Sequence, residues 1–463
     1  MPFERNYLKL YSFRGKPLKQ FALLDTELDL NQFQGAQKEQ LCAHGKTFQY
    51  WRMRIMLCMI AGYASFYLIR QNFSLAIPAI EQDLGYSKTQ IGAIWSAGAL
   101  LYGLGKAAAG LIGDRMSARY LMTFGLFMSG VTSFYFGLCD NLSHFMTAWV
   151  VNMCFQSLGW PSCARLLTHW FSPKELGTKW AVWNSSQQIG GAIILIVGGY
   201  LLMHAGWRYV FFVPAIFSMC MAIFLLFAMR DTPESIGLPS MEEHHGLEKN
   251  TDDAHMSSWE VLTQQVLRNK LVWYMCIANF FVYVTRMSLF TWGPTMLREM
   301  KGSTIYEATS LTAAYDIAGI FGGILAGILS DKFFKGYRGR AGFFFMLGIS
   351  AAITFLWLSP VGSTWAHLIG MVGIGFMISG PQILVGVAAV DFSSKRTAGV
   401  ASGLTGTIGY MGTAAAGAGF GALVEYCGWD YTFMVMSVST LVGAFFFALT
   451  WNHRSKLLDE TNT

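Results

Sequence analysis

Long apolar runs recur along almost the whole chain and limit the folds that it can adopt. About 20 consecutive apolar residues suffice for a helix to cross the hydrocarbon core of a bilayer. Charged residues make up only 13% of this chain, whereas soluble domains carry about 25%. These features predict an all-α membrane protein. Its twelve predicted transmembrane helices cover residues 52–80, 89–112, 119–138, 144–168, 178–203, 208–229, 270–297, 306–330, 341–359, 364–390, 398–424 and 430–451.

The longest polar interval lies in the middle of the chain and separates two groups of six apolar runs. It contains prolines and acidic residues, and we interpret it as a cytoplasmic linker. The predicted division is an N-terminal extension (1–50), a six-helix half (51–229), the linker (230–268), a second six-helix half (269–452) and a tail (453–463).

The positions of the basic residues predict the orientation of the chain in the membrane. Lys and Arg gather in the N-terminal extension, in the linker and in alternate loops, whereas the opposite loops hold few. An excess of basic residues marks cytoplasmic loops, so both termini are expected in the cytoplasm. This placement also explains the net charge of +6 without a nucleic-acid partner.

The two groups of apolar runs repeat in sequence. AAGLIGDRMSAR at 108–119 matches LAGILSDKFFKGYRGR at 325–340, in each case after the second run of the group. One arginine in the first run of each group precedes these turns by similar intervals. Arg70 lies 44 residues before Asp114, and Arg286 lies 45 residues before Asp331. Six-helix repeats with a site between them at mid-membrane are typical of alternating-access transporters.

Arg70 and Arg286 are each surrounded in sequence by apolar residues. A charge in hydrocarbon costs about 2.5–3.5 kcal/mol on insertion scales, so such residues usually face a cavity. The planar guanidinium group binds two phosphate oxygens at once. We therefore predict that one anion binds between the two arginines. The alternative is a structural arginine that is satisfied by backbone carbonyls or by an acidic partner.

Tyrosines accompany both arginines at the same spacing. Tyr63 and Tyr67 precede Arg70 by seven and three residues, and Asn279 and Tyr283 precede Arg286 in the same way. This spacing places each set on one helical face. The hydroxyl groups are candidates to bind phosphate or sugar, and the alternative for each tyrosine is packing or an interfacial position.

Three further polar residues lie deep in predicted helices. Lys106 either faces the cavity or extends to the nearby cytoplasmic surface. Gln187, with Asn184 and Gln188 on the same face, either binds a neighbouring helix or lines the cavity. Asp316 is expected to pair with a cation of the cavity, either as a gate or to orient an arginine.

The charges of the predicted cavity favour a phosphorylated substrate. Arg70, Lys106 and Arg286 against Asp316 leave about two positive charges, and a phosphomonoester carries about −1.5 to −2 near neutral pH. The first six predicted helices hold no deep acidic residue. Because proton relays use such residues, we expect exchange of one phosphate compound for another and no proton coupling.

The remaining polar features predict structure and not chemistry. The eight cysteines occur singly and without zinc-site spacing, so we expect free thiols, no metal and no cofactor. There is no nucleophile–base constellation, and we expect no enzymatic activity. The acidic–basic turns are predicted to hold the cytoplasmic side closed in one state through Asp114, Arg115, Arg119, Asp331 and Lys332.

Several motifs give the chain a more specific resemblance. They are GWPSCARLLTHWFSPKELGTKWAVWN (159–184), RDTPESIGLP (230–239), GYASFYLIRQNF and FFVYVTRMSLFTW. With them the chain resembles the organophosphate:phosphate antiporters of the major facilitator superfamily, and it is closest to their hexose-phosphate transporter and sensor branch. The resemblance implies the major facilitator fold. It also implies phosphate binding by Arg70 and Arg286, charged positions at Lys106 and Asp316, and cavity tyrosines at Tyr63, Tyr67, Tyr283 and Tyr410.

The chain departs from the family pattern at four positions near the predicted site. Gln71 replaces the usual lysine, Thr291 replaces an aspartate, Gln187 replaces a histidine, and Gln188 replaces the neighbouring asparagine. The first two changes neutralise both partners of one charge pair together. The cavity is therefore expected to depend mainly on its two arginines.

The predicted function is import of a sugar phosphate, with glucose 6-phosphate as the first candidate, in exchange for inorganic phosphate. The protein is expected to be a monomer in the lipid bilayer of the cell inner membrane. Two alternatives remain open. In the first, the chain is a hexose-phosphate sensor with little or no transport. In the second, it is a transporter whose substrate is glycerol 3-phosphate.

Overall fold

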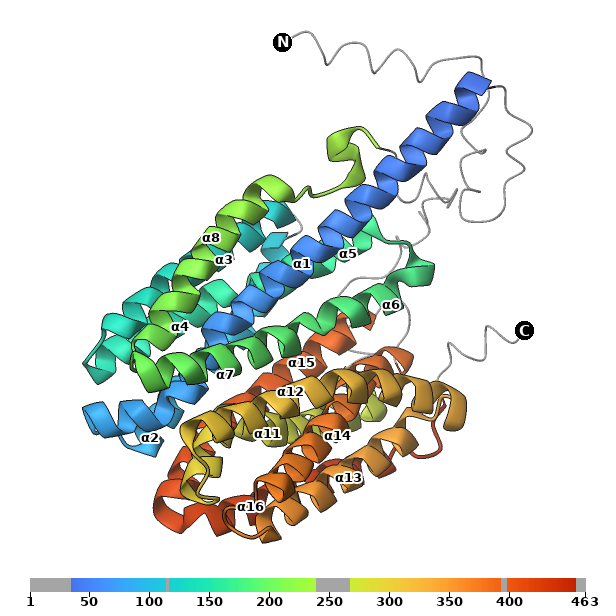
Figure 1. Cartoon of the computed structure of the whole chain (residues 1–463). Helices are drawn as coiled ribbons and strands as arrows, with labels where there is room; N and C mark the ends of the chain where they lie inside the picture. The colour runs from blue at the N-terminus through green and yellow to red at the C-terminus, as the bar shows by residue number, and fades with distance from the viewer. Residues whose placement is uncertain (1–34, 114–115, 239–266, 393–397, 455–463) are drawn as a thin grey trace.

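The computed structural model describes residues 35–113, 116–238, 267–392 and 398–454, and the regular structure within these ranges is entirely helical (Figure 1). This confirms the predicted all-α class. The helices are α1 (Gly35–Leu84), α2 (Lys88–Gly113), α3 (Ala118–Leu138), α4 (Leu142–Gln156), α5 (Gly159–Trp170), α6 (Pro173–Asn184), α7 (Ser186–His204), α8 (Tyr209–Ala228), α11 (Lys270–Glu299), α12 (Ile305–Ile328), α13 (Arg338–Leu358), α14 (Thr364–Asp391), α15 (Ala398–Ala414) and α16 (Phe420–Ala448).

Some predicted runs are bent in the structure. The fourth run is divided between α4 and α5 at Ser157 and Leu158, and the fifth is divided between α6 and α7 at Ser185. The eleventh and twelfth runs meet within α16 at Gly428, whose φ of 83° favours glycine. The sequence is apolar on both sides of each bend, so hydropathy alone does not reveal the bends.

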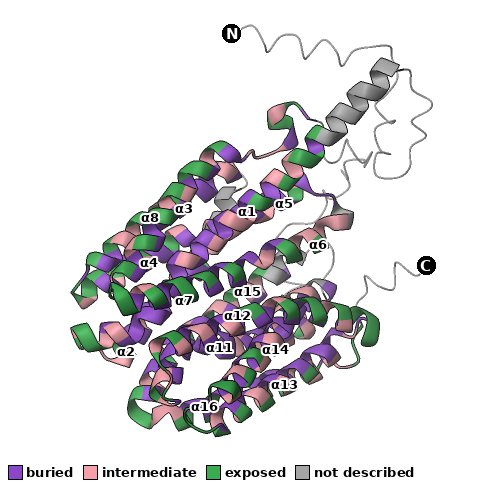
Figure 2. Ribbon diagram, in the orientation of Figure 1, coloured by how far each residue is buried: buried purple, intermediate pink, exposed green. Residues whose placement is uncertain are grey.

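The described residues contain nine stretches that are long enough and apolar enough to cross a membrane. One of them, Gly403–Ala448, holds most of the last two predicted spans. Large apolar side chains are exposed on the outside of the bundle, where Figure 2 shows the exposed class on outward helix faces. Phe227 and Leu358, for example, are 69% and 73% exposed. Such a surface suits contact with lipid, which is as apolar as these side chains.

Helices α1–α8 and α11–α16 form two groups, coloured blue to green and yellow to red in Figure 1. Between the groups, α1 contacts α11, α7 contacts α12, and α2 contacts α15 and α16. These contacts bring the first helix of each predicted half together. The residue boundaries of the halves and of the linker remain predictions.

The two groups are joined by polar contacts where α2 begins, here called the Lys88 end. Lys88 Nζ lies 2.9 Å from Glu299 Oε1 and 3.4 Å from Glu81 Oε2. The backbone N–H of Thr89 donates to Glu425 Oε2 at 2.9 Å. Since Glu299 and Glu425 belong to the second group, these bonds close the Lys88 end of the molecule.

The described parts of the predicted acidic–basic turns bind within their own group. Asp331 pairs with Arg338, whose Nε also lies 3.3 Å from Asp391 Oδ2. The backbone N–H of Arg119 donates to Asp231 Oδ1 at 2.7 Å. No ion pair is found for Lys332 among the described residues. Asp114 and Arg115 lie outside the described residues, so the predicted closing role of the turns remains a prediction.

Arg52 of α1 and Glu175 of α6 form an ion pair that joins the two helices. Glu175 accepts hydrogen bonds from Arg52 and from the backbone N–H of Ser172. Burial raises the pKa of Glu175, but these hydrogen bonds outweigh burial and hold the pKa below its usual value. A lowered pKa stabilises the fold at neutral pH, and this contribution is lost as the pH falls through the folded-state pKa.

Glu175→Gln is therefore expected to lower the melting temperature slightly at neutral pH and not in acid. The pair is partly exposed, so the contribution is about 1 kcal/mol or less. Thermal denaturation of both proteins at the two pH values measures the difference. An equal difference at both would contradict this account of the ion pair.

Candidate substrate site

A cavity with a volume of about 110 Å³ lies between the two groups of helices. All eight predicted substrate-binding residues line it, although the structure does not test whether they bind substrate. They are Tyr63, Tyr67, Arg70, Lys106, Gln187, Tyr283, Arg286 and Tyr410.

Arg70 is held in place by a buried glutamine and by aromatic rings. Its Nε donates to Gln156 Oε1 at 2.7 Å, and Gln156 Nε2 donates to the carbonyl oxygen of Ile69 at 3.2 Å. The guanidinium carbon lies 4.2 Å from the ring centroid of Tyr102 and 5.0 Å from that of Tyr67. Gln156 thus fixes the Nε edge, and the two terminal nitrogens are the donors suited to a phosphate.

Arg286 enters the same cavity from α11 and is only 6% exposed. Its electrostatic neighbours are Tyr67, Tyr283, Tyr315 and Asp316. No ion pair involving Arg70, Lys106 or Arg286 is present within the described ranges. The structural alternative was an arginine satisfied by backbone carbonyls or by an acidic partner. Asp316 is an acidic neighbour of Arg286 but is not ion-paired with it, and Arg70 is bonded to the neutral Gln156. The cavity therefore favours an anionic ligand.

Lys106 faces aromatic rings in the cavity. Its Nζ lies 3.9 Å from the ring centroid of Trp160 and 5.7 Å from that of Tyr410. A cation over an aromatic face is stabilised by about 0.5–2 kcal/mol. Lys106 thus adds a third positive charge to the wall without direct contact to a described carboxylate.

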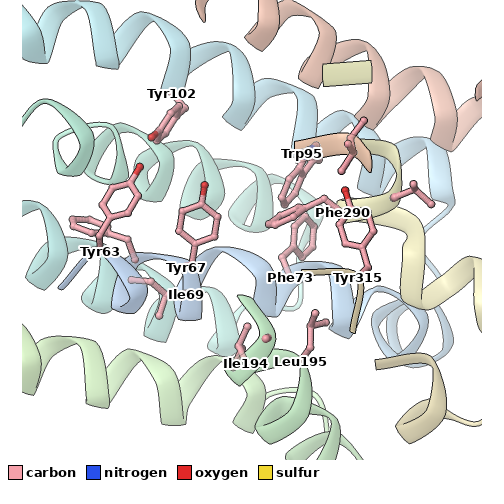
Figure 3. Close-up of a cluster of buried hydrophobic side chains, with 14 of the residues drawn as sticks. Tyr63, Tyr67, Ile69, Phe73, Trp95, Tyr102, Ile194, Leu195, Phe290 and Tyr315 are labelled. Carbon is pink, nitrogen blue, oxygen red and sulfur yellow. The ribbon is translucent and has the colours of Figure 1, made fainter. Parts of the chain in front are cut away.

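Each group contributes a tyrosine that lies near a side-chain amide. The Tyr67 hydroxyl donates to Gln187 Oε1 at 2.8 Å, and Tyr283 lies near the amide of Gln382. Figure 3 shows the Tyr63 and Tyr67 hydroxyls on the side of α1 that faces Tyr102. Amides and hydroxyls both donate and accept hydrogen bonds, so these walls suit the hydroxyl groups of a sugar.

An aromatic cluster bounds one part of the cavity. Trp95 lies 5.3 Å from Trp149 and 5.8 Å from Phe290, measured between ring centroids. Figure 3 shows Trp95, Phe73 and Phe290 gathered together. Phe290 belongs to the second group of helices, so this cluster also joins the two groups near the site.

Several of these side chains were not predicted from the sequence. Tyr102, Trp160 and Gln382 line the cavity, and Gln156 positions Arg70. Gln156 and Gln382 carried a signal, because each is a polar residue within an apolar run. Tyr102 and Trp160 look like ordinary aromatic residues until distant helices come together. Asn279, by contrast, binds the carbonyl oxygen of Thr405 at 2.8 Å and joins α11 to α15.

Asp316 has a different partner from the predicted one. Its Oδ2 accepts a hydrogen bond from Gln71 Nε2 at 2.9 Å, and no cation of the described chain is ion-paired with it. The expected ion pair is replaced by this neutral donor because Gln71 of α1 faces α12 directly. Whether Asp316 acts as a gate remains a prediction.

The described residues contain no group of three or more His, Cys, Asp or Glu side chains placed to hold a metal. The site is thus a set of cations, amides and aromatic rings. Its chemistry supports recognition of an anionic, hydroxylated ligand.

Comparison with known proteins decides the family. The model of the Major Facilitator Superfamily matches residues 59–417. The chain belongs to the major facilitator superfamily. A solved relative in fold is a bacterial homologue of the human lysosomal transporter Spinster in an inward-facing conformation. It has a TM-score of 0.67 and 17% identity, over 87% of this chain and 95% of that one.

Similar proteins place this major facilitator chain among organophosphate transporters and sensors, as the motifs indicated. A probable hexose phosphate transport protein of Chlamydia muridarum is 39% identical, over 88% of this chain and 92% of its own. The glycerol-3-phosphate transporter of Bacillus subtilis is 38% identical, over 87% and 92%. The membrane sensor protein UhpC of Escherichia coli is 35% identical, over 86% and 91%.

Proposed function

We propose that this protein exchanges a sugar phosphate for inorganic phosphate across the cell inner membrane by alternating access. The observation that carries the proposal is the placement of Arg70 and Arg286, one from each helix group, on a single cavity. The three cations of this cavity suit a phosphate, and its amides suit a sugar. Glucose 6-phosphate is the first candidate substrate. It crosses the membrane without chemical change, and the transporting unit is a monomer.

The closed Lys88 end gives this proposal a direction. With both termini in the cytoplasm, α2 begins on the outer side of the membrane. The bonds of Lys88 with Glu81 and Glu299 then close the outer side. Closure of this side supports an inward-facing state. Binding of phosphate between the two arginines draws the halves together. The cavity then opens toward the outer side of the membrane.

A sensor is the second candidate, and its support is the 35% identity to a membrane sensor protein. A sensor and a transporter can share the same binding cavity, so geometry alone does not separate them. The two functions differ in whether the bound anion crosses the membrane.

Counterflow in proteoliposomes separates the two functions. Vesicles that contain the purified protein and are loaded with unlabelled phosphate are expected to accumulate labelled phosphate. External glucose 6-phosphate is expected to compete more strongly than glycerol 3-phosphate. Protein-free vesicles are the control. Saturable binding of glucose 6-phosphate without any counterflow would contradict the antiporter proposal and support the sensor.

A further inference from the structure

The hydrogen bond between Gln71 and Asp316 crosses between the two halves at a buried position. Gln71 of α1 is 0% exposed and Asp316 of α12 is 5% exposed. Gly191 of α7 covers the pair closely. A methyl group at Gly191 would overlap Gln71 Oε1 and lie 2.7 Å from Asp316 Oδ2. The Gly191 backbone therefore lies close to both the Gln71 amide and the Asp316 carboxyl group.

The pair is incompletely satisfied if Asp316 is ionised. Gln71 Nε2 donates to Asp316 Oδ2, but Gln71 Oε1 is buried and has no hydrogen-bond partner among the described residues. A carboxylate offers only acceptors, so it cannot bond to Oε1. An added proton gives the carboxyl group an O–H donor, and it also removes a buried charge that costs free energy in a membrane.

The elements packed against Asp316 provide one charged neighbour. These elements are α7, α11 and α14, together with α1 through Gln71. From α11, the Arg286 guanidinium is the charged neighbour, although the two are not ion-paired. A nearby opposite charge favours the ionised form of a carboxyl group. On α12 itself, Tyr315 is the titratable neighbour. On α7, Gln188 and Gly191 are neutral, and on α14, Ser379 lies near Gly319, one turn further along α12.

We propose that Asp316 is a proton-binding site between the two halves. In the conformation of the structure the carboxyl group is protonated and forms a two-way bond with the Gln71 amide. Nε2 donates to the carboxyl, and the carboxyl O–H donates to Oε1. Release of the proton breaks the second bond and leaves a charge at the contact between α1 and α12. Proton binding therefore stabilises this arrangement of the halves.

Substrate is linked to this proton through Arg286, a step that rests on the proposed function. Phosphate bound to Arg286 neutralises the one cation that favours ionised Asp316. Binding of phosphate is therefore accompanied by uptake of a proton at Asp316, which departs from the expectation of no proton coupling. The linkage is reciprocal, because any effect of phosphate on the proton equals the effect of the proton on phosphate affinity.

Infrared difference spectroscopy of the reconstituted protein tests the proton site without any transport. Near neutral pH, the wild type is expected to show the carbonyl stretch of a protonated carboxyl group, and Asp316→Asn is expected to lose it. Gln71→Lys is the decisive variant, because it keeps Asp316 but supplies a cation, and the same band should disappear. Asp391→Asn is the matched control. Asp391 is also buried but lies beside Arg338, so its removal should leave the band unchanged.

The outcomes for the two proposals are distinct. Identical carboxyl bands in the wild type and Asp316→Asn would overturn the proton site, as would a band that persists in Gln71→Lys. Addition of inorganic phosphate at a pH where the band is partial should increase it, and no change on saturation would overturn the linkage. A protein that shows the band but binds no phosphate would contradict the proposed function and not the proton site.

Discussion

Replacing Arg70 by lysine is expected to reduce phosphate exchange roughly 30- to 150-fold, which corresponds to about 2–3 kcal/mol. Lysine retains the charge but loses the planar pair of donors that binds two phosphate oxygens at once. It also loses Nε, through which Gln156 orients the side chain. The initial rate of counterflow at subsaturating substrate measures the effect.

Arg54→Lys provides the matched control on the same helix. Arg54 stacks on the Trp51 ring at 4.7 Å and does not line the cavity. Its exchange rate should equal that of the wild type. If Arg70→Lys retains wild-type exchange, the guanidinium geometry is not what binds the anion.

Gly92→Leu is expected to reduce exchange about 5- to 150-fold while phosphate binding is retained. A Cβ atom at Gly92 would overlap the carbonyl oxygen of Gly417, so α2 and the segment before α16 touch backbone to backbone. Overpacking of this kind costs about 1–3 kcal/mol, and it acts on the state in which the Lys88 end is closed. Transport needs both states, whereas binding needs only one of them.

The control for this variant is Gly327→Leu, since a Cβ atom at Gly327 meets nothing within 4 Å. It should exchange phosphate at the wild-type rate. Equilibrium binding and counterflow are measured on the same preparations. Normal exchange by Gly92→Leu would show that close approach of Gly92 and Gly417 is not part of the cycle. Loss of binding together with exchange would point to a damaged fold.

Periodic and repeated features of the sequence predicted much of the architecture. The apolar runs predicted the helices, and the paired arginines predicted one shared cavity, because an internal repeat places equivalent residues opposite each other. All eight predicted substrate-binding residues line it, whereas Asp316, which was also counted among the cavity charges, does not. The bends at Ser157 and Ser185 were not predicted, because they interrupt the backbone without interrupting the apolar character.

The partners of individual polar groups could not be predicted in the same way. Gln156 lies 86 residues from Arg70, and Gln71 lies 245 residues from Asp316, so only the packed helices bring them together. A cation was the expected partner of Asp316 because buried carboxylates are usually paired. The structure supplies an amide instead, and the proposed proton follows from that difference.

Calorimetric titration of inorganic phosphate into the purified protein tests most directly whether Arg70 and Arg286 bind one anion between the halves. The wild type, Arg70→Lys and Arg286→Lys are compared under the same conditions. We predict one phosphate per chain in the wild type, and a loss of affinity of about tenfold or more in each lysine variant. Two phosphates per chain, or unchanged affinity in either variant, would contradict a single site shared by the two arginines.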